Sequence, residues 1–90
     1  MMSEPIEFTF VIVVFESTEP SYRVIGEILS EDGAKATVTA DFDSLEAAEG
    51  CFAAHEETAV KRDFRCISRN AIPKDEDSWI TMSRWRSNNA

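Results

Sequence analysis

The fold is decided in residues 36–59, where the chain reads ATVTADFDSLEAAEGCFAAHEETA. Its first seven residues alternate between apolar and polar side chains, which predicts a strand with one buried face over residues 36–42. Asp43 follows as the predicted N-cap of a helix, with Glu46 at the capping-box position. The helix is expected to end near Val60, because an apolar stripe recurs at helical spacing through Leu45, Ala48, Phe52, His55 and Ala59, with Cys51 beside it.

Strands are expected on both sides of this segment. Residues 6–15 are rich in β-branched and aromatic side chains and become apolar on both faces from Val11 onward. This pattern indicates a strand that is buried on both sides, or one whose second face meets another chain. Residues 22–29, 64–69 and 79–85 are further predicted strands, and Glu31-Asp32-Gly33 is a predicted turn in which Gly33 can adopt positive φ.

The predicted element order is β-β-β-α-β-β, which favours the α+β class: a single antiparallel sheet with one helix packed on one face. The first three strands are expected to form a meander, and the last two a hairpin with a long loop over residues 70–77. The length of 90 residues fits a single domain over 1–90, with residues 1–5 and 87–90 expected to fray.

The sequence favours a cytoplasmic protein. The apolar run over residues 6–15 is far shorter than a membrane span, neither Lys nor Arg precedes it, and no small-residue cleavage site follows it. Cys51 and Cys66 do not form a CxxC pair, so buried free thiols are expected, with a disulfide between them as the alternative.

Charge is unevenly distributed along the chain. The net charge is −8, and residues 1–59 hold thirteen acidic and two basic residues, whereas residues 60–90 hold seven basic and four acidic ones. This balance disfavours nucleic acid and anionic membranes as direct partners and favours a protein with a basic surface. Solubility alone is a second explanation for the charge of a small domain.

Candidate catalytic chemistry is sparse. Cys51 and His55 stand one helical turn apart, where a histidine can activate a thiolate, but their place on the apolar stripe favours a packed thiol. No ligand spacing predicts a metal site, and the three isolated glycines form no phosphate loop, so we expect no metal and no cofactor. The chain is therefore expected not to be an enzyme.

Two candidate partner-binding surfaces emerge. The first is an acidic face on the helix and the preceding strand, formed by Asp41, Glu46, Glu49, Glu56 and Glu57. The second is a basic and aromatic hairpin formed by Arg65, Arg69, Trp79, Arg84 and Trp85. If the two hairpin strands pair with these side chains on one face, arginine can stack on tryptophan. Such a surface suits a protein interface, single-stranded nucleic acid, or neutralisation of the acidic part of the same chain.

The function favoured by the sequence is a non-enzymatic, acidic protein-binding module, monomeric or homodimeric. The specific hypothesis is an inhibitor whose acidic face contacts a basic nucleic-acid-binding protein or complex. Phage anti-defence and anti-CRISPR-like inhibitors are similar in size and charge, although no motif in this chain identifies that class. Two alternatives stay open: a structural or assembly subunit that self-associates through its apolar first strand, and a small-ligand binder or thiol enzyme that uses Cys51 and His55.

Overall fold

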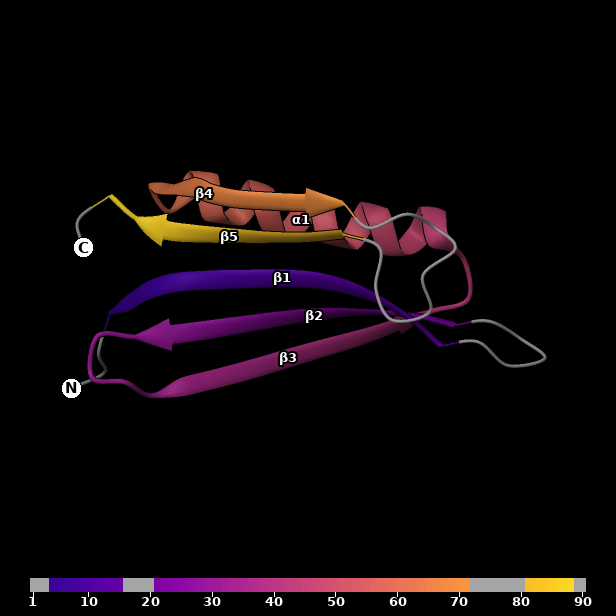
Figure 1. The fold of residues 1–90 in the computed structure, drawn as a ribbon, viewed down its shortest axis with the longest axis horizontal. Coiled ribbons are helices and arrows are strands. Elements are labelled where there is room, and N and C mark those ends of the chain that lie inside the picture. The colour runs from indigo at the N-terminus through magenta and orange to yellow at the C-terminus, as the bar shows by residue number, and fades with distance from the viewer. Residues whose placement is uncertain (1–3, 16–20, 72–80, 89–90) are drawn as a thin grey trace.

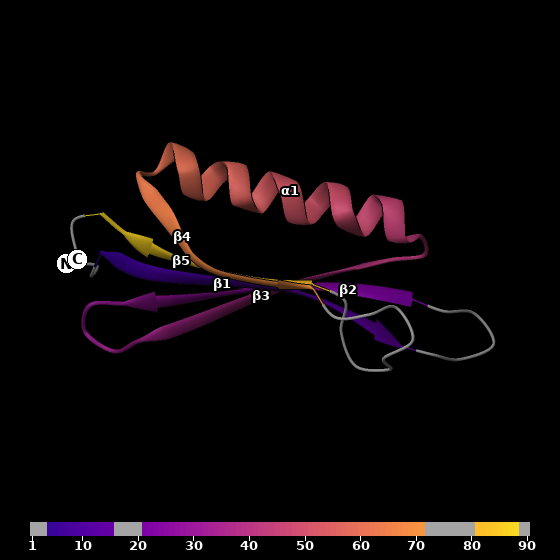
Figure 2. The same ribbon diagram turned by 45° about the horizontal axis from the view of Figure 1, so that its top comes forward.

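The computed structural model describes residues 4–15, 21–71 and 81–88. In this part of the chain, five strands form one antiparallel sheet with a single helix on one face, which confirms the predicted α+β fold (Figures 1 and 2). The elements are β1 (Pro5–Phe15), β2 (Ser21–Ser30), β3 (Lys35–Phe42), α1 (Leu45–Lys61), β4 (Phe64–Ala71) and β5 (Thr81–Ser87).

The strand order in the sheet is β3-β2-β1-β5-β4. It contains the predicted meander of β1 to β3 and the predicted hairpin of β4 and β5. β1 joins the two parts, because it pairs with β2 on one side and with β5 on the other. Figure 1 shows β3 and β4 at opposite edges of the sheet, with α1 behind the β4–β5 side.

A tight turn joins β2 to β3 at the predicted position. Gly33 has a φ of 89°, a left-handed conformation that a glycine adopts without steric cost, and its N–H donates to the Ser30 carbonyl at 2.9 Å. The Asp32 carboxylate accepts from the Ala34 N–H at 2.9 Å, which satisfies the backbone where the turn ends.

The start of α1 differs from the prediction by one residue. Ser44, not Asp43, is the N-cap: its backbone is extended, and its hydroxyl accepts from the Ala47 N–H at 3.2 Å. Glu46 therefore lies inside the first turn, one position before the capping-box site. The helix ends at Lys61, one residue beyond the predicted end, and Asp63 takes a φ of 65° as the chain turns back into β4.

The core lies between α1 and the sheet. The even-numbered side chains Phe8, Phe10 and Ile12 of β1 point toward the helix. Phe8 stacks on Phe64 with ring centroids 4.4 Å apart, and Phe10 meets Phe52 edge to face at 6.4 Å. The remaining buried hydrophobic residues are Val24, Ala48, Ala59 and Trp85.

The other face of the sheet, which we call the open face, is not covered by α1. Strand alternation directs the odd-numbered residues of β1, β2 and β3 and the even-numbered residues of β5 to this face. Its centre is apolar and half-buried, with Val11, Val13, Ile25 and Met82 side by side on three strands. The second apolar face predicted for the first strand is therefore present on the open face.

Candidate protein-binding surfaces

Four of the five predicted acidic residues lie on α1, but they differ in exposure and pairing. Glu46 and Glu49 are exposed, and no ion pair joins either of them to another described residue. Glu57 is exposed and pairs with Lys61 at 3.1 Å on the same helix. Glu56 is different, because its side chain is only 16% exposed and its carboxylate accepts from Arg69 of β4 at 2.6 Å.

Three of these carboxylates form one outward surface. Glu46 and Glu49 are three residues apart, and Glu46 and Glu57 are eleven residues, about three helical turns, apart. The spacing puts all three on one side of α1, away from the buried stripe of Ala48, Phe52 and Ala59. We call Glu46, Glu49 and Glu57 the acidic helix surface.

Asp41, the fifth predicted acid, lies on the open face and so on the opposite side of the sheet from α1. Its two carboxylate oxygens accept from the Arg23 guanidinium of β2, at 2.7 Å from Nε and 3.1 Å from Nη2. These hydrogen bonds hold the pKa of Asp41 below its ordinary value of 3.8 and raise the pKa of Arg23. The structure therefore does not bring Asp41 together with the helix glutamates.

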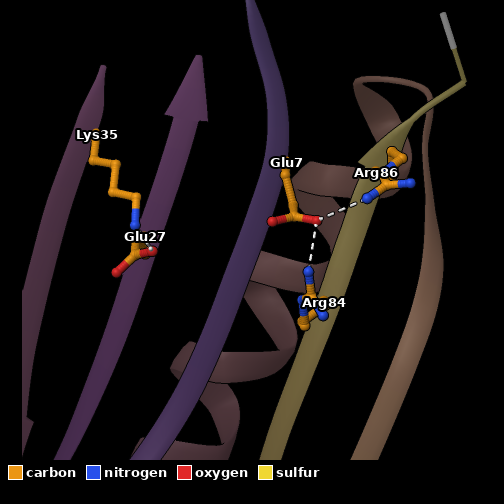
Figure 3. A network of polar contacts seen from close by, with 5 residues as sticks. All are labelled: Glu7, Glu27, Lys35, Arg84 and Arg86. Atoms are coloured by element: carbon orange, nitrogen blue, oxygen red, sulfur yellow. Dashed lines mark hydrogen bonds and ion pairs between the residues drawn. The ribbon is translucent and has the colours of Figure 1, made fainter. Parts of the chain in front are cut away.

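A second group of ion pairs lies on the open face (Figure 3). One carboxylate oxygen of Glu7 accepts from Arg84 at 3.0 Å and from Arg86 at 3.4 Å. Lys35 and Glu27 face each other on neighbouring strands with 3.8 Å between Nζ and Oε1. Arg84, predicted as part of a partner-binding hairpin, thus pairs within the chain.

Trp85 does not lie on the exposed stacking surface that the sequence indicated. Trp85 is 6% exposed and packs in the core, where its indole N–H donates to the Ser83 hydroxyl at 2.9 Å. Trp79 lies outside the described residues. A buried Trp85 is a core residue, so its assignment to a binding surface is wrong.

A β-bulge explains why the predicted arginine face does not form. The register between β4 and β5 shifts between Cys66 and Ser68, so Arg65 pairs with Arg86 whereas Arg69 pairs with Ser83. Arg86 faces the open side and Ser83 faces the helix. Arg65 and Arg69 therefore lie on opposite faces, and the prediction that they share one face with tryptophan is wrong.

Charge is separated between the two sides of the molecule. The helix carries four glutamates against one lysine. The open face carries more basic than acidic side chains, namely Arg23, Lys35, Arg65, Arg84 and Arg86 against Glu7, Glu27 and Asp41. α1 is therefore the acidic element on its side of the sheet, and further exposed acids lie outside it, at Glu4, Glu31 and Asp43.

An apolar groove of about 180 Å³ lies between α1 and the strands β2 and β3. Sequence reasoning missed it, because the alternation of residues 36–42 predicted that Val38 is buried, whereas Val38 is 50% exposed. The reason is that the helix lies toward the other edge of the sheet and leaves most of β3 uncovered (Figure 1). The groove is lined by Phe8, Phe10, Gly26, Ile28, Val38, His55, Thr58 and Arg62.

The predicted Cys51–His55 contact is present. Cys51 Sγ lies 3.6 Å from His55 Nε2, and the imidazole stacks on the Phe10 ring with centroids 5.3 Å apart. His55 lines the groove but Cys51 does not, so a molecule in the groove would meet the ring and not the sulfur. This geometry is that of a packed thiol beside a core-edge histidine. Both cysteines are free, but Cys66 is exposed, so the expectation of a buried thiol is wrong for Cys66.

Across the residues that the structure describes, no three His, Cys, Asp or Glu side chains gather as a metal ion requires, and no helix is long and apolar enough to cross a membrane. Comparisons with protein-family models, curated proteins and solved structures found no match to this chain.

Proposed function

We propose that this domain is a non-enzymatic, cytoplasmic protein-binding module whose acidic helix surface contacts a basic protein. The observation that carries the proposal is the position of Glu46 and Glu49, which are exposed on α1 without an ion-pair partner among the described residues. Exposed carboxylates on a rigid helix give a fixed negative field that steers a cationic partner and selects against acidic ones.

The specific form of the proposal is an inhibitor of a nucleic-acid-binding protein. Carboxylates on one side of a helix present negative charges in a row, as phosphates do along a nucleic acid, and can occupy the same basic channel. The net charge of −8 supports this form, because the molecule as a whole attracts a basic surface, although its open face carries more basic than acidic side chains.

The test compares two double charge reversals. Glu46→Lys/Glu49→Lys removes the unpaired part of the acidic helix surface, whereas Glu4→Lys/Glu31→Lys changes the net charge equally at exposed acids outside α1. Each protein and the unaltered domain serve as bait in a nuclease-treated lysate of the cells that express it, and the captured proteins are identified by mass spectrometry. We expect a basic protein that the unaltered domain and the control retain and that the helix variant loses.

The affinity of the purified prey is then measured with and without nucleic acid. We expect the helix reversal to weaken binding at least about tenfold, and added nucleic acid to displace the domain. Equal capture by both variants would contradict the acidic helix surface as the binding site. If the prey bound nucleic acid and the domain at the same time, the inhibitor form would be contradicted. The broader proposal of a protein-binding module would still stand.

A second candidate function is that of an assembly subunit built on the first strand. Val11 and Val13 favour it, because they are apolar, half-buried and aligned with Ile25 on the open face. Val11→Thr/Val13→Thr keeps the β-branched shape while adding polarity, and we expect it to dissociate an oligomer formed through this face, as measured by light scattering. An oligomer that persists in this variant would contradict the open face as its interface.

A further inference from the structure

The two edges of the sheet are not equivalent. The β4 edge is interrupted by the bulge between Cys66 and Ser68, which breaks the regular spacing of its backbone groups. β3 pairs with β2 without interruption through eight residue pairs, from Tyr22↔Phe42 to Leu29↔Lys35. No described strand pairs with the outer edge of β3. A long regular edge of this kind is a template for another strand.

The hydrogen-bonding groups on that outer edge follow from the turn that precedes β3. The Ser30 N–H donates to the Ala34 carbonyl at 2.9 Å, so Ala34 directs its backbone groups toward β2. In an antiparallel ladder the direction alternates from residue to residue. The odd-numbered residues therefore direct their N–H and C=O groups outward; they are Lys35, Thr37, Thr39 and Asp41.

We propose that β3 pairs antiparallel with β3 of a second copy of this chain, about a twofold axis that passes through Val38. In this register Lys35 lies opposite Asp41 of the second copy, Thr37 opposite Thr39, and Ala36 opposite Ala40. The Lys35–Asp41 and Thr37–Thr39 pairs are then hydrogen-bonded pairs, because the backbone groups of these residues point outward. The two Val38 residues form a non-hydrogen-bonded pair, in which the side chains lie closer together. Opposite charges and threonine pairs across strands stabilise a sheet.

Charge selects this register over its neighbours. A shift of two residues in one direction puts Asp41 opposite Gly33 in the turn, and a shift in the other direction puts it opposite Thr37. In the proposed register, the Arg23–Asp41 ion pair of one copy lies beside the Lys35–Glu27 ion pair of the other copy, in one row across the open face. The charges then alternate in sign across four adjacent strands, so Asp41 lies between two bases and Lys35 lies between two carboxylates.

The opposite face of the same edge is apolar. Val38 is 50% exposed and sits beside the groove lined by Gly26 and Ile28, so an isolated copy leaves apolar surface in water. Pairing puts Val38 against its own symmetry mate and Ala36 against Ala40. The result is one continuous sheet of ten strands, with both α1 helices on the same face because paired residues of an antiparallel ladder share a face.

Charge reversal with mixing tests the register. Lys35→Glu puts two carboxylates opposite each other in a homodimer, and Asp41→Lys puts two ammonium groups opposite each other. A heterodimer of the two variants restores both opposite-charge pairs. We expect sedimentation equilibrium to show self-association of the unaltered protein, dissociation constants at least about tenfold weaker for each variant alone, and recovery in the equimolar mixture, seen as heterodimer by native mass spectrometry.

A loss of fold would not be rescued by mixing, so recovery separates interface from stability effects. A monomeric unaltered protein at every concentration, variants that associate as the unaltered protein does, or a mixture without heterodimer would each overturn the proposal.

Cysteine cross-linking tests the axis independently. Val38→Cys puts two thiols on a non-hydrogen-bonded pair with Cα atoms about 4.5 Å apart, within disulfide range. We expect mild oxidation to give a covalent dimer that peptide mapping assigns to position 38 in both chains. Ala36→Cys is the matched control, because its symmetry mate lies four residues along the ladder. Absence of the position-38 link, or equal linking in the control, would overturn the twofold axis.

Discussion

Ser83 satisfies the one polar atom of Trp85 inside the core. Its hydroxyl accepts from the indole N–H at 2.9 Å, and its own exposure is 1%. We expect Ser83→Ala to lower the free energy of unfolding by about 1–3 kcal/mol, because it leaves the indole donor buried without a partner. Urea denaturation measures the change. In a Trp85→Phe background the same substitution should cost less, and an equal cost in both backgrounds would contradict the hydrogen bond as the cause.

Asp41 gives the stability of the β2–β3 pair a defined pH dependence. Because Arg23 holds the pKa of Asp41 below 3.8 in the folded protein, Asp41 stabilises the fold above its unfolded-state pKa. This contribution is lost as the pH falls through the folded pKa. We expect an NMR titration of the Asp41 carboxyl to have a midpoint below 3.8, and Arg23→Gln to raise it toward 3.8. A midpoint unchanged by Arg23→Gln would show that the pair does not form in solution.

At the scale of single elements, replacing either of two glycines with alanine is expected to change the free energy of unfolding in opposite directions. Gly50 lies inside α1 with open space where a Cβ would be, so Gly50→Ala should raise the free energy of unfolding by about 1 kcal/mol. Gly33 has a φ of 89° in the turn, so Gly33→Ala should lower it by about 1 kcal/mol or more. Thermal denaturation of both variants measures the difference, and changes of the same sign would contradict the local backbone explanation.

The strands and the helix followed from periodicity, and the errors arose where the chain departs from it. Alternation in residues 36–42 predicted β3, but it does not say which part of a sheet the helix covers, and so Val38 was expected to be buried. The bulge between Cys66 and Ser68 reverses the facing of Arg69 relative to Arg65. No residue type at that point indicates a β-bulge in the sequence. The arginine and tryptophan surface was predicted from strict alternation, and the bulge prevents it from forming.

For the whole molecule, the sequence is acidic before residue 60 and basic after it, whereas the folded sheet has acidic side chains on α1 and a basic excess on the open face. The acids on the described strands of the meander are paired on the open face, Glu7 with Arg84, Glu27 with Lys35 and Asp41 with Arg23. The helix glutamates point the other way, and only Glu56 reaches an arginine of the second hairpin. The proposed pairing through β3 keeps both helices on one face, so a dimer would present two acidic helix surfaces in the same direction and bind an extended partner with higher avidity.

The central place of β1 has a consequence for synthesis on the ribosome. Its partners on one side are residues 81–86, so β1 cannot complete its pairing until a strand much later in the sequence has been made. Until then, β1 is an apolar strand with unpaired backbone groups along one edge. Such a strand is prone to chaperone binding or misassembly. The acids that precede and follow β1 in the sequence give the growing polypeptide a negative charge that repels other copies until β5 has been made.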